Sequence, residues 1–466
     1  MEMTKKELPV KVIQYGEGNF LRAFVDWMID ILNEKGDFNG SVAVVQPLEN
    51  GLINLLNEQN CDYHHVRQGL ENGEKVDDIR KITCISKAIN PFTDTQSYFD
   101  LATEPEAELV FSNTTEAGIA FDENDKPAAG QLAVTYPGKL TQLLKARFDH
   151  FHGDHDKGLA IIPCELIEQN GTKLKECVSQ YVSTWGLGAD FQNWVDHACS
   201  FANTLVDRIV PGYPKDEIDS LLARIGEPDK LVVKSETFHL FVIEAEDKVK
   251  ELFPADKLGL NVKFVKDITP YRTQKVRILN GAHTSMVPIG LLYGLETVSE
   301  TIEDQETGKL IHELIYDEIV PTIQIPNEDP KEFADAVIAR FQNPFIRHEL
   351  ISISLNSIAK FKVRVLPTFK DYIATKGELP KRITFSLACL LKLYTSGEFN
   401  LKDDQSNLDF FESIKVLNSK DLVFKALSNT DFWGEDLTAI AGLTDQVIDH
   451  FDSISSSAMK EVIYNI

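Results

Sequence analysis

Residues 10–23 read VKVIQYGEGNFLRA, and this stretch decides the fold class. The short apolar run Val10 to Tyr15 predicts a buried strand of a parallel sheet. Gly16 and Gly18 follow directly, and then comes a helix with apolar residues on one side. Strand, glycine turn and helix predict the start of a dinucleotide-binding unit, whose glycines let the backbone approach a pyrophosphate. The third glycine of the usual motif is missing, so a glycine turn without a ligand stays open as an alternative.

Further buried strands extend this unit toward residue 268. The apolar runs predict strands at 41–46, 108–112, 158–164 and 261–265, and an antiparallel excursion at 63–70 and 79–85. Helices are predicted at 139–152 and near 171–186 and 188–203, and 230–243 is expected to be a sheet edge with a loop. We therefore predict an α/β Rossmann-like, dinucleotide-binding domain over residues 1–268.

The pattern changes after Lys275, because strand-like runs give way to helical periodicity. We expect a mostly α-helical substrate and catalytic domain over residues 269–466. Its helices are predicted at 275–294, 299–320, 330–342, 345–363, 380–396, 407–427 and 441–462.

The helix over 275–294, KVRILNGAHTSMVPIGLLYG, carries polar groups in an otherwise apolar pattern. At about 100° per residue, Lys275, Asn280 and His283 span an arc of roughly 140°. An amine, an amide and an imidazole that converge in this way suit carbonyl–alcohol redox chemistry. A helix start with a snorkelling lysine and two satisfied polar groups is the alternative.

Three stretches resemble one known family. The spacing of Lys275, Asn280 and His283 is similar to the catalytic signature of the polyol-specific long-chain dehydrogenases, the mannitol dehydrogenase family. The runs Val206–Pro211, VDRIVP, and Gly16–Ala23, GEGNFLRA, resemble two further hallmarks. The runs FSNTTEAGI and IIPCELI look closest to a branch that acts on uronates. The resemblance implies that Lys275 is the general acid/base and that Asn280 and His283 position the carbonyl.

The same resemblance implies a cofactor site in the first domain. It places Gly16, Gly18, Asn19 and Phe20 at the cofactor, and Asn113 and Glu116 near the nicotinamide, where ordinary turn chemistry is the alternative. The second strand usually ends at an acid that binds the adenosine ribose, but here it ends at Gln46-Pro47, and Glu49 is the nearest acid. No arginine stands nearby for a 2′-phosphate, so NAD is favoured over NADP. An asparagine that helps hold the carbonyl in the mannitol branch is replaced by Leu166, and Glu165, Asn170 or a water is expected to take its role.

Charge bears on the substrate. The formal net charge is −25, so an anionic substrate needs a local group of cations. Lys360 and Arg364 share a helix face in the run KFKVR, and a solvated helix end is the alternative reading. Arg272, one helical turn before Lys275, is the rival.

The composition excludes several classes. So acidic a chain does not suit nucleic acid. No apolar run is long enough to span a bilayer, and no signal peptide is visible, so we expect a cytoplasmic protein. Six scattered cysteines indicate buried thiols in a reducing compartment, and no metal site is expected.

These observations predict an NAD-dependent oxidoreductase that interconverts a keto-uronate and a sugar acid, D-tagaturonate and D-altronate in the first instance. Fructuronate or a neutral polyol of the mannitol type is the nearest alternative substrate. A nucleotide-sensing binding protein without turnover is the alternative of another class. We expect a monomer or a small homo-oligomer, with no nucleic-acid or membrane partner.

Overall fold

The computed structural model describes residues 8–71, 73–128 and 130–466, which form two compact units. The first comprises the described residues up to Gln68 together with Lys75–Ile268. The second comprises Thr269–Ile466 and the described residues of the segment 69–74. Each unit is described below by itself.

A six-stranded parallel sheet organises the first unit, in the order β5-β2-β1-β6-β7-β8. This is the order of a doubly wound dinucleotide-binding sheet, in which the two halves meet between β1 and β6. The predicted Rossmann-like class is thus confirmed. The strands are β1 (Val10–Tyr15), β2 (Ser41–Val45), β5 (Ile85–Ile89), β6 (Leu109–Ser112), β7 (Ala160–Pro163) and β8 (Ser200–Phe201).

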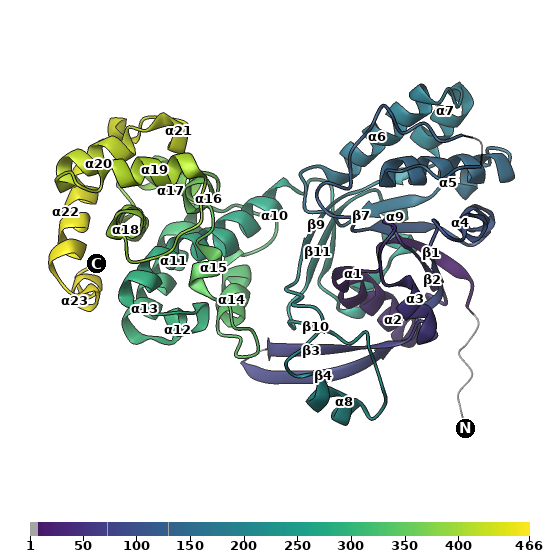
Figure 1. Ribbon diagram of the computed structural model, residues 1–466, viewed down its shortest axis with the longest axis horizontal. Helices are drawn as coiled ribbons and strands as arrows, with labels where there is room; N and C mark the ends of the chain where they lie inside the picture. Colours follow the sequence, from purple (N-terminus) through teal and green to yellow (C-terminus); the bar gives the residue numbers. More distant parts are fainter. Residues whose placement is uncertain (1–7, 72, 129) are drawn as a thin grey trace. The chain divides into compact units, whose positions relative to one another are not determined.

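Side chains from alternate positions of these strands fill two cores. Val42 and Val44 of β2 point into one core, whereas Ala43 and Val45 point into the other. This is the period-2 pattern of a sheet that is covered on both faces. Helices α5, α6 and α7 cover one face and α1 and α2 cover the other (Figure 1). The first unit contains α1 (Asn19–Ala23), α2 (Val25–Lys35), α3 (Ile53–Glu58), α4 (Thr95–Asp100), α5 (Tyr136–His150), α6 (Asn170–Thr184), α7 (Ala189–His197), α8 (Ile218–Ile225) and α9 (Asp247–Leu252).

Two smaller sheets complete this unit. One joins β10 (Val233–Ser235), β3 (Tyr63–Glu71) and β4 (Glu74–Ile82), and the other joins β12 (Val262–Val265), β11 (Leu240–Glu244) and β9 (Asn203–Asp207). Two sequence predictions are corrected here, because the helix expected over 188–203 ends at His197 and the strand expected over 79–85 divides between β4 and β5. The sheet edge expected within 230–243 is β10, whereas β11 is the central strand of its sheet.

The second unit is helical, as predicted, and is built around α11 (Gly281–Tyr293). Every residue from Gly281 to Leu291 is buried, because α11 packs against α18, α15 and α16 of the same unit (Figure 1). The remaining helices are α10 (Thr269–Gln274), α12 (Val298–Glu303), α13 (Gln305–Glu313), α14 (Pro330–Phe341), α15 (Leu350–Ile353), α16 (Ser357–Arg364), α17 (Leu366–Lys376), α18 (Lys381–Ser396), α19 (Gln405–Ile414), α20 (Ser419–Leu427), α21 (Thr430–Trp433), α22 (Leu443–Ser456) and α23 (Met459–Tyr464).

Several of the long helices expected here are divided into shorter ones. The helix predicted over 299–320 is α12, α13 and a π-helical segment, Leu314–Ile319, and the one over 345–363 is α15 and α16. Asp304 is the N-cap of α13, and its carboxylate accepts hydrogen bonds from the backbone amides of Glu306 and Thr307. This cap starts a new helix at a point where the apolar pattern of the sequence continues without a break.

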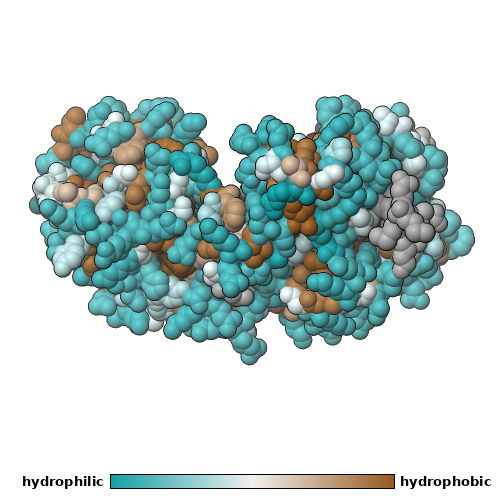
Figure 2. Space-filling view, turned by 90° about the horizontal axis from the view of Figure 1, so that it is seen from below, coloured by the Kyte–Doolittle hydropathy of each residue, from teal (hydrophilic) through white to brown (hydrophobic). Residues whose placement is uncertain are grey.

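The surface is mainly hydrophilic on the face drawn in Figure 2, and the thiols are buried, as expected from the sequence. All six cysteines are buried, and none of them forms a disulfide within the described ranges. Across the residues that the structure covers, none of the helices combines the length and the apolar character that a membrane span requires.

Candidate functional site

The three residues predicted to be catalytic lie on one continuous helical segment, but its geometry differs from the prediction. Lys275–Asn280 is a π-helix between α10 and α11. A π-helix bonds residue i to i+5 and occurs mostly as a single turn inside α-helices, frequently at functional sites. Lys275 and Asn280 are five residues apart, so their side chains are closer to alignment than the predicted arc of an ideal α-helix allows. The sequence analysis missed this because a one-turn π segment leaves the apolar pattern almost unchanged.

His283 is buried in the first turns of α11, whereas Lys275 and Asn280 are half-buried. Its imidazole packs on Phe341 with ring centroids 4.4 Å apart and meets His348 edge-on at 5.0 Å. The pKa of His283 lies well below its usual value because of burial, with further lowering by the charges of His348, Arg340, Arg364 and Lys360. Burial and these charges therefore favour the neutral form of the imidazole.

The predicted basic residues lie on two helices. Arg272 is half-buried on α10, and Lys360 and Arg364 lie one turn apart on α16. The Lys360 amine donates a hydrogen bond to the carbonyl of Ile353 at 2.8 Å, which ties it to the backbone. The side chain of Arg364 has no hydrogen bond or ion pair to any residue that the structure describes. Burial lowers the pKa of both residues, so each charge lies in a partly desolvated setting.

Sequence reasoning missed two members of this group, Arg340 and His348. Arg340 lies in the last turn of α14, and His348 lies in the connection to α15. Both are distant from Lys275 in the chain and neither belongs to a periodic pattern, so only the fold brings them to His283. The sequence offered one signal for them, namely that Arg340 and His348 stand on either side of an Asn-Pro pair.

The predicted cofactor residues of the first unit follow the carboxyl ends of parallel strands. Gly16 comes after β1 with φ +125°, and an added Cβ would lie 3.1 Å from the carbonyl oxygen of Asn113. Gly18 and Asn19 are exposed, and a Cβ on Gly18 would meet no heavy atom within 4 Å. Phe20 stacks on Phe24. The turn is thus open to a ligand on one side and closely packed on the other, which fits the approach of a pyrophosphate to the backbone.

The end of β2 is organised by Gln46. This buried side chain donates hydrogen bonds to the carbonyls of Leu48 and Glu49, at 2.8 and 2.9 Å. Glu17 reaches the same loop and accepts a hydrogen bond from the Leu52 backbone amide. Glu49 itself is exposed. The amide that replaces the usual acid therefore shapes the loop, which leaves the Glu49 carboxylate in solvent.

Beyond β6, the turn is held by Glu165, which follows β7. The buried Glu165 carboxylate accepts hydrogen bonds from the Ser112 hydroxyl and from the amide and hydroxyl of Thr114. Burial raises its pKa. The side-chain amide of Asn113 donates to the Cys164 carbonyl, and Glu116 is exposed. Glu165 thus fixes the turn that carries Asn113.

The residues considered as replacements at Leu166 have other partners. Leu166 is exposed, and Asn170 is fully buried and donates to the carbonyls of Pro163 and Glu165 and to the Thr204 hydroxyl. Asn170 and Glu165 therefore hold the turns that follow β7 and β6 through these hydrogen bonds. Arg208 of the VDRIVP run donates to the backbone carbonyls of Ala23 and Glu236, and burial lowers its pKa to about 9. These contacts with backbone carbonyls indicate a structural role for Arg208.

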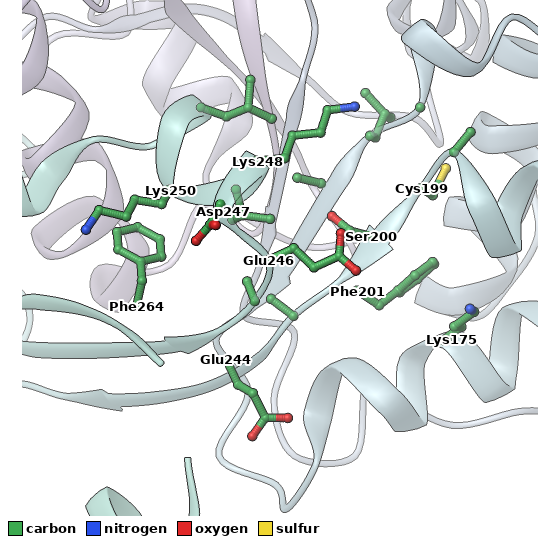
Figure 3. A pocket seen from close by; sticks show the side chains of 18 of the residues that line it. Lys175, Cys199, Ser200, Phe201, Glu244, Glu246, Asp247, Lys248, Lys250 and Phe264 are labelled. Carbon is green, nitrogen blue, oxygen red and sulfur yellow. The ribbon is translucent and has the colours of Figure 1, made fainter. Parts of the chain in front are cut away.

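A cavity of the first unit lies away from these turns. It measures about 810 Å³ and is bordered by the start of β7, by β8 and by the ends of β11 and β12 (Figure 3). Lys175 and Asp196, which form an ion pair, line it together with Lys248 and Glu246. The N-terminal end of β7 is opposite to the edge that carries Gly16 and Asn113. None of the predicted cofactor residues lines this cavity.

Comparison with known proteins places this geometry in context. Residues 10–255 match the profile of the mannitol dehydrogenase Rossmann domain, and residues 267–455 match that of the mannitol dehydrogenase C-terminal domain. The chain is 45% identical to an altronate oxidoreductase of Phocaeicola vulgatus, over 99% of this chain and 98% of the relative. It is 46% identical to that of Bacillus subtilis, over 98% and 95%.

Solved structures share the fold at lower identity. A D-sorbitol dehydrogenase in substrate-free form superposes with a TM-score of 0.81 at 21% identity, over 98% of this chain and 95% of that chain. Mannitol 2-dehydrogenase of Pseudomonas fluorescens, in a ternary complex with NAD and D-mannitol, gives 0.65 at 19% identity, over 98% and 94%. At these identities the likeness concerns the fold.

Proposed function

Because the chain belongs to the mannitol dehydrogenase family, we propose that it is an NAD-dependent oxidoreductase that interconverts D-tagaturonate and D-altronate. The observation that carries the substrate is the 43–46% identity to altronate oxidoreductases over 98–99% of the chain. The cationic surroundings of His283 support an acid rather than a neutral polyol.

The cofactor proposal rests on the glycine turn. The backbone at Gly18 and Asn19 would hold the pyrophosphate, and the exposed Glu49 would approach the adenosine ribose. The Glu165-braced turn would present Asn113 and Glu116 near the nicotinamide. When bound, NAD accepts or supplies the two electrons and one hydrogen of the reaction.

The second unit supplies the acid–base chemistry in this proposal. In the reducing direction the Lys275 ammonium gives a proton to the substrate oxygen, and in the oxidising direction its amine removes that proton. The Asn280 amide donates a hydrogen bond to the same oxygen and stabilises the charge that develops there. His283, held between Phe341 and His348 and kept neutral, orients the substrate by hydrogen bonding. The π-helix brings the first two side chains toward one face.

The test is NADH oxidation, followed by absorbance, with D-tagaturonate, D-fructuronate, D-tagatose and D-fructose. We expect the highest kcat/KM with D-tagaturonate. A higher value with D-fructuronate would move the enzyme to the isomeric uronate, and a higher value with a neutral ketose would make it a polyol dehydrogenase. NADH binding without turnover of any of the four would support a nucleotide-binding protein instead.

A further inference from the structure

One nitrogen beside the proposed catalytic helix lacks a partner. The Nε2 atom of His283 is buried and makes no hydrogen bond to any residue that the structure describes. The ring is otherwise enclosed by Phe341 and His348. A buried polar atom without a partner is unfavourable, so such an atom in a native protein is accounted for by a strain, a role in catalysis or a ligand.

The groups around this nitrogen share one sign of charge. Arg340, Lys360 and Arg364 each lower the pKa of His283, and they come from two different helices, α14 and α16. The chain as a whole has 72 acidic and 47 basic residues. Three cations and two imidazoles in one place are therefore a local reversal of the protein's overall charge, which favours an anion at this point.

The basic residues around His283 differ in their exposure and in their hydrogen bonds. The Lys360 amine already donates to the Ile353 carbonyl, and Arg340 is buried with 9% exposure. Arg364 and His348 are both partly exposed. His348 also touches His283, with the two rings nearly perpendicular at 79°. His348 and Arg364 are therefore the members of the group that are both partly exposed and, among the described residues, not tied to the backbone by a side-chain hydrogen bond.

We infer that His348 is a specificity-determining residue, which forms with Arg364 an anion pocket beside His283 for the carboxylate of a sugar acid. This inference rests on the proposed function and names the group that selects its substrate class. A guanidinium binds a carboxylate through two parallel N–H bonds, and an imidazole N–H supplies a third donor. A neutral polyol leaves the positive charge uncompensated, so it binds less well. Arg340 and Lys360 add positive charge near His283.

The experiment compares His348→Leu and His348→Gln with wild type, because Gln retains a donor and Leu does not. Kinetics are measured with D-tagaturonate and with D-tagatose, which has a hydroxymethyl group in place of the carboxylate. We expect His348→Leu to raise KM for D-tagaturonate about tenfold, the loss of one charge-assisted hydrogen bond. D-tagatose should change little, and His348→Gln should recover part of the preference. Equal changes with both substrates, or no change, would overturn the inference.

The adjacent Arg347 offers a matched control. Its side chain is 60% exposed and pairs with Glu296 and Glu349. We expect Arg347→Leu to leave the preference for charged over neutral substrate unchanged. If it lowers that preference as much as His348→Leu does, the effect is general electrostatics rather than a pocket.

A binding measurement separates this inference from the proposed function. D-gluconate and D-sorbitol differ only in a terminal carboxylate, and calorimetric titration of the NAD-loaded enzyme with each requires no turnover. We expect tighter binding of D-gluconate in wild type and loss of that difference in His348→Leu. If this holds while D-tagaturonate is not reduced, only the proposed function fails. If D-tagaturonate is reduced but the difference is absent or is unaffected by His348, only the inference fails.

Discussion

The carbonyl oxygen of Arg364 lies 3.2 Å from the position that a Cβ atom on Gly281 would occupy. Gly281 follows the π-helix directly, with an ordinary helical φ of −66°, so the need for glycine here is steric. The end of α16 thus rests against the backbone of the proposed catalytic helix. This close approach of the two backbones sets the spacing between α16 and the start of α11.

Gly281→Ala tests this coupling. Alanine favours the helix by about 1 kcal/mol, which offsets part of the crowding against Arg364, so we expect the melting temperature to change little. A displacement of α16 by a few tenths of an ångström should lower kcat/KM for D-tagaturonate several-fold and affect D-tagatose less. Unchanged kinetics together with a higher melting temperature would show that the contact does not position the site.

Lys275→Ala should remove most turnover, because general acid/base catalysis contributes about 10²–10⁴-fold. NADH binding, followed by fluorescence titration, should stay near wild type. Lys309→Ala is the control, because Lys309 lies on α13 of the same unit with a side chain that is 75% exposed. Turnover of Lys275→Ala within a few-fold of wild type would remove this lysine from the mechanism.

Cofactor choice should favour NADH. The stretch 41–66 contains no lysine or arginine, and the exposed Glu49 would repel a 2′-phosphate. We expect kcat/KM for NADH to exceed that for NADPH about tenfold or more, because like charges in contact are strongly unfavourable. Glu49→Arg should narrow this ratio, whereas Glu58→Arg, at an exposed residue further along the chain, should not. Equal efficiency of wild type with both cofactors would contradict the assignment.

Asp26 should make the protein less stable as the pH rises. Its carboxyl is buried on α2, and burial raises its pKa to about 7, although Gln14 and Tyr63 donate hydrogen bonds to it. In the unfolded chain the pKa is about 3.9, so the native state binds more protons between these values. The stabilising contribution is complete below about pH 4 and is lost as the pH rises to about 7, with an upper bound of about 4 kcal/mol.

Asp26→Asn removes this titration. We expect the melting temperature of the variant to fall less steeply than that of wild type between about pH 4 and 7. The exposed Asp37 serves as the control, and Asp37→Asn should follow the wild-type curve. Parallel curves for Asp26→Asn and wild type would show that Asp26 does not carry the pH dependence.

The parallel sheet was predictable because its physics is local. Each strand is a short apolar run, and Gly16 stands where the backbone must turn with positive φ beside Asn113. The two-residue strand β8 was missed, since so short a run has no pattern of its own and its pairing with β7 is a tertiary effect. The helix predicted over 188–203 ends at His197 because the following residues, Ser200 and Phe201, pair with β7 as β8.

The candidate site divides in the same way. Lys275, Asn280 and His283 are close in sequence, so their spacing alone predicted one face, and only the π-helical turn between the first two was missed. Arg340 and His348 reach His283 through the packing of α14 and its following connection against α11. No periodicity in the sequence encodes that approach.

The last prediction concerns the cation that holds the carboxylate. Arg364→Gln should raise KM for D-tagaturonate about ten- to a hundredfold, because a bidentate charge-assisted contact contributes about 1.5–3 kcal/mol. D-tagatose should be affected much less. Lys360→Met should have a smaller effect than Arg364→Gln, since the Lys360 amine already donates to the Ile353 carbonyl.

Arg272→Gln tests the rival position on α10. An arginine that only stabilises the fold would instead lower the melting temperature and weaken both substrates alike. If neither Arg364→Gln nor Arg272→Gln changes the preference for the charged substrate, neither arginine binds the carboxylate.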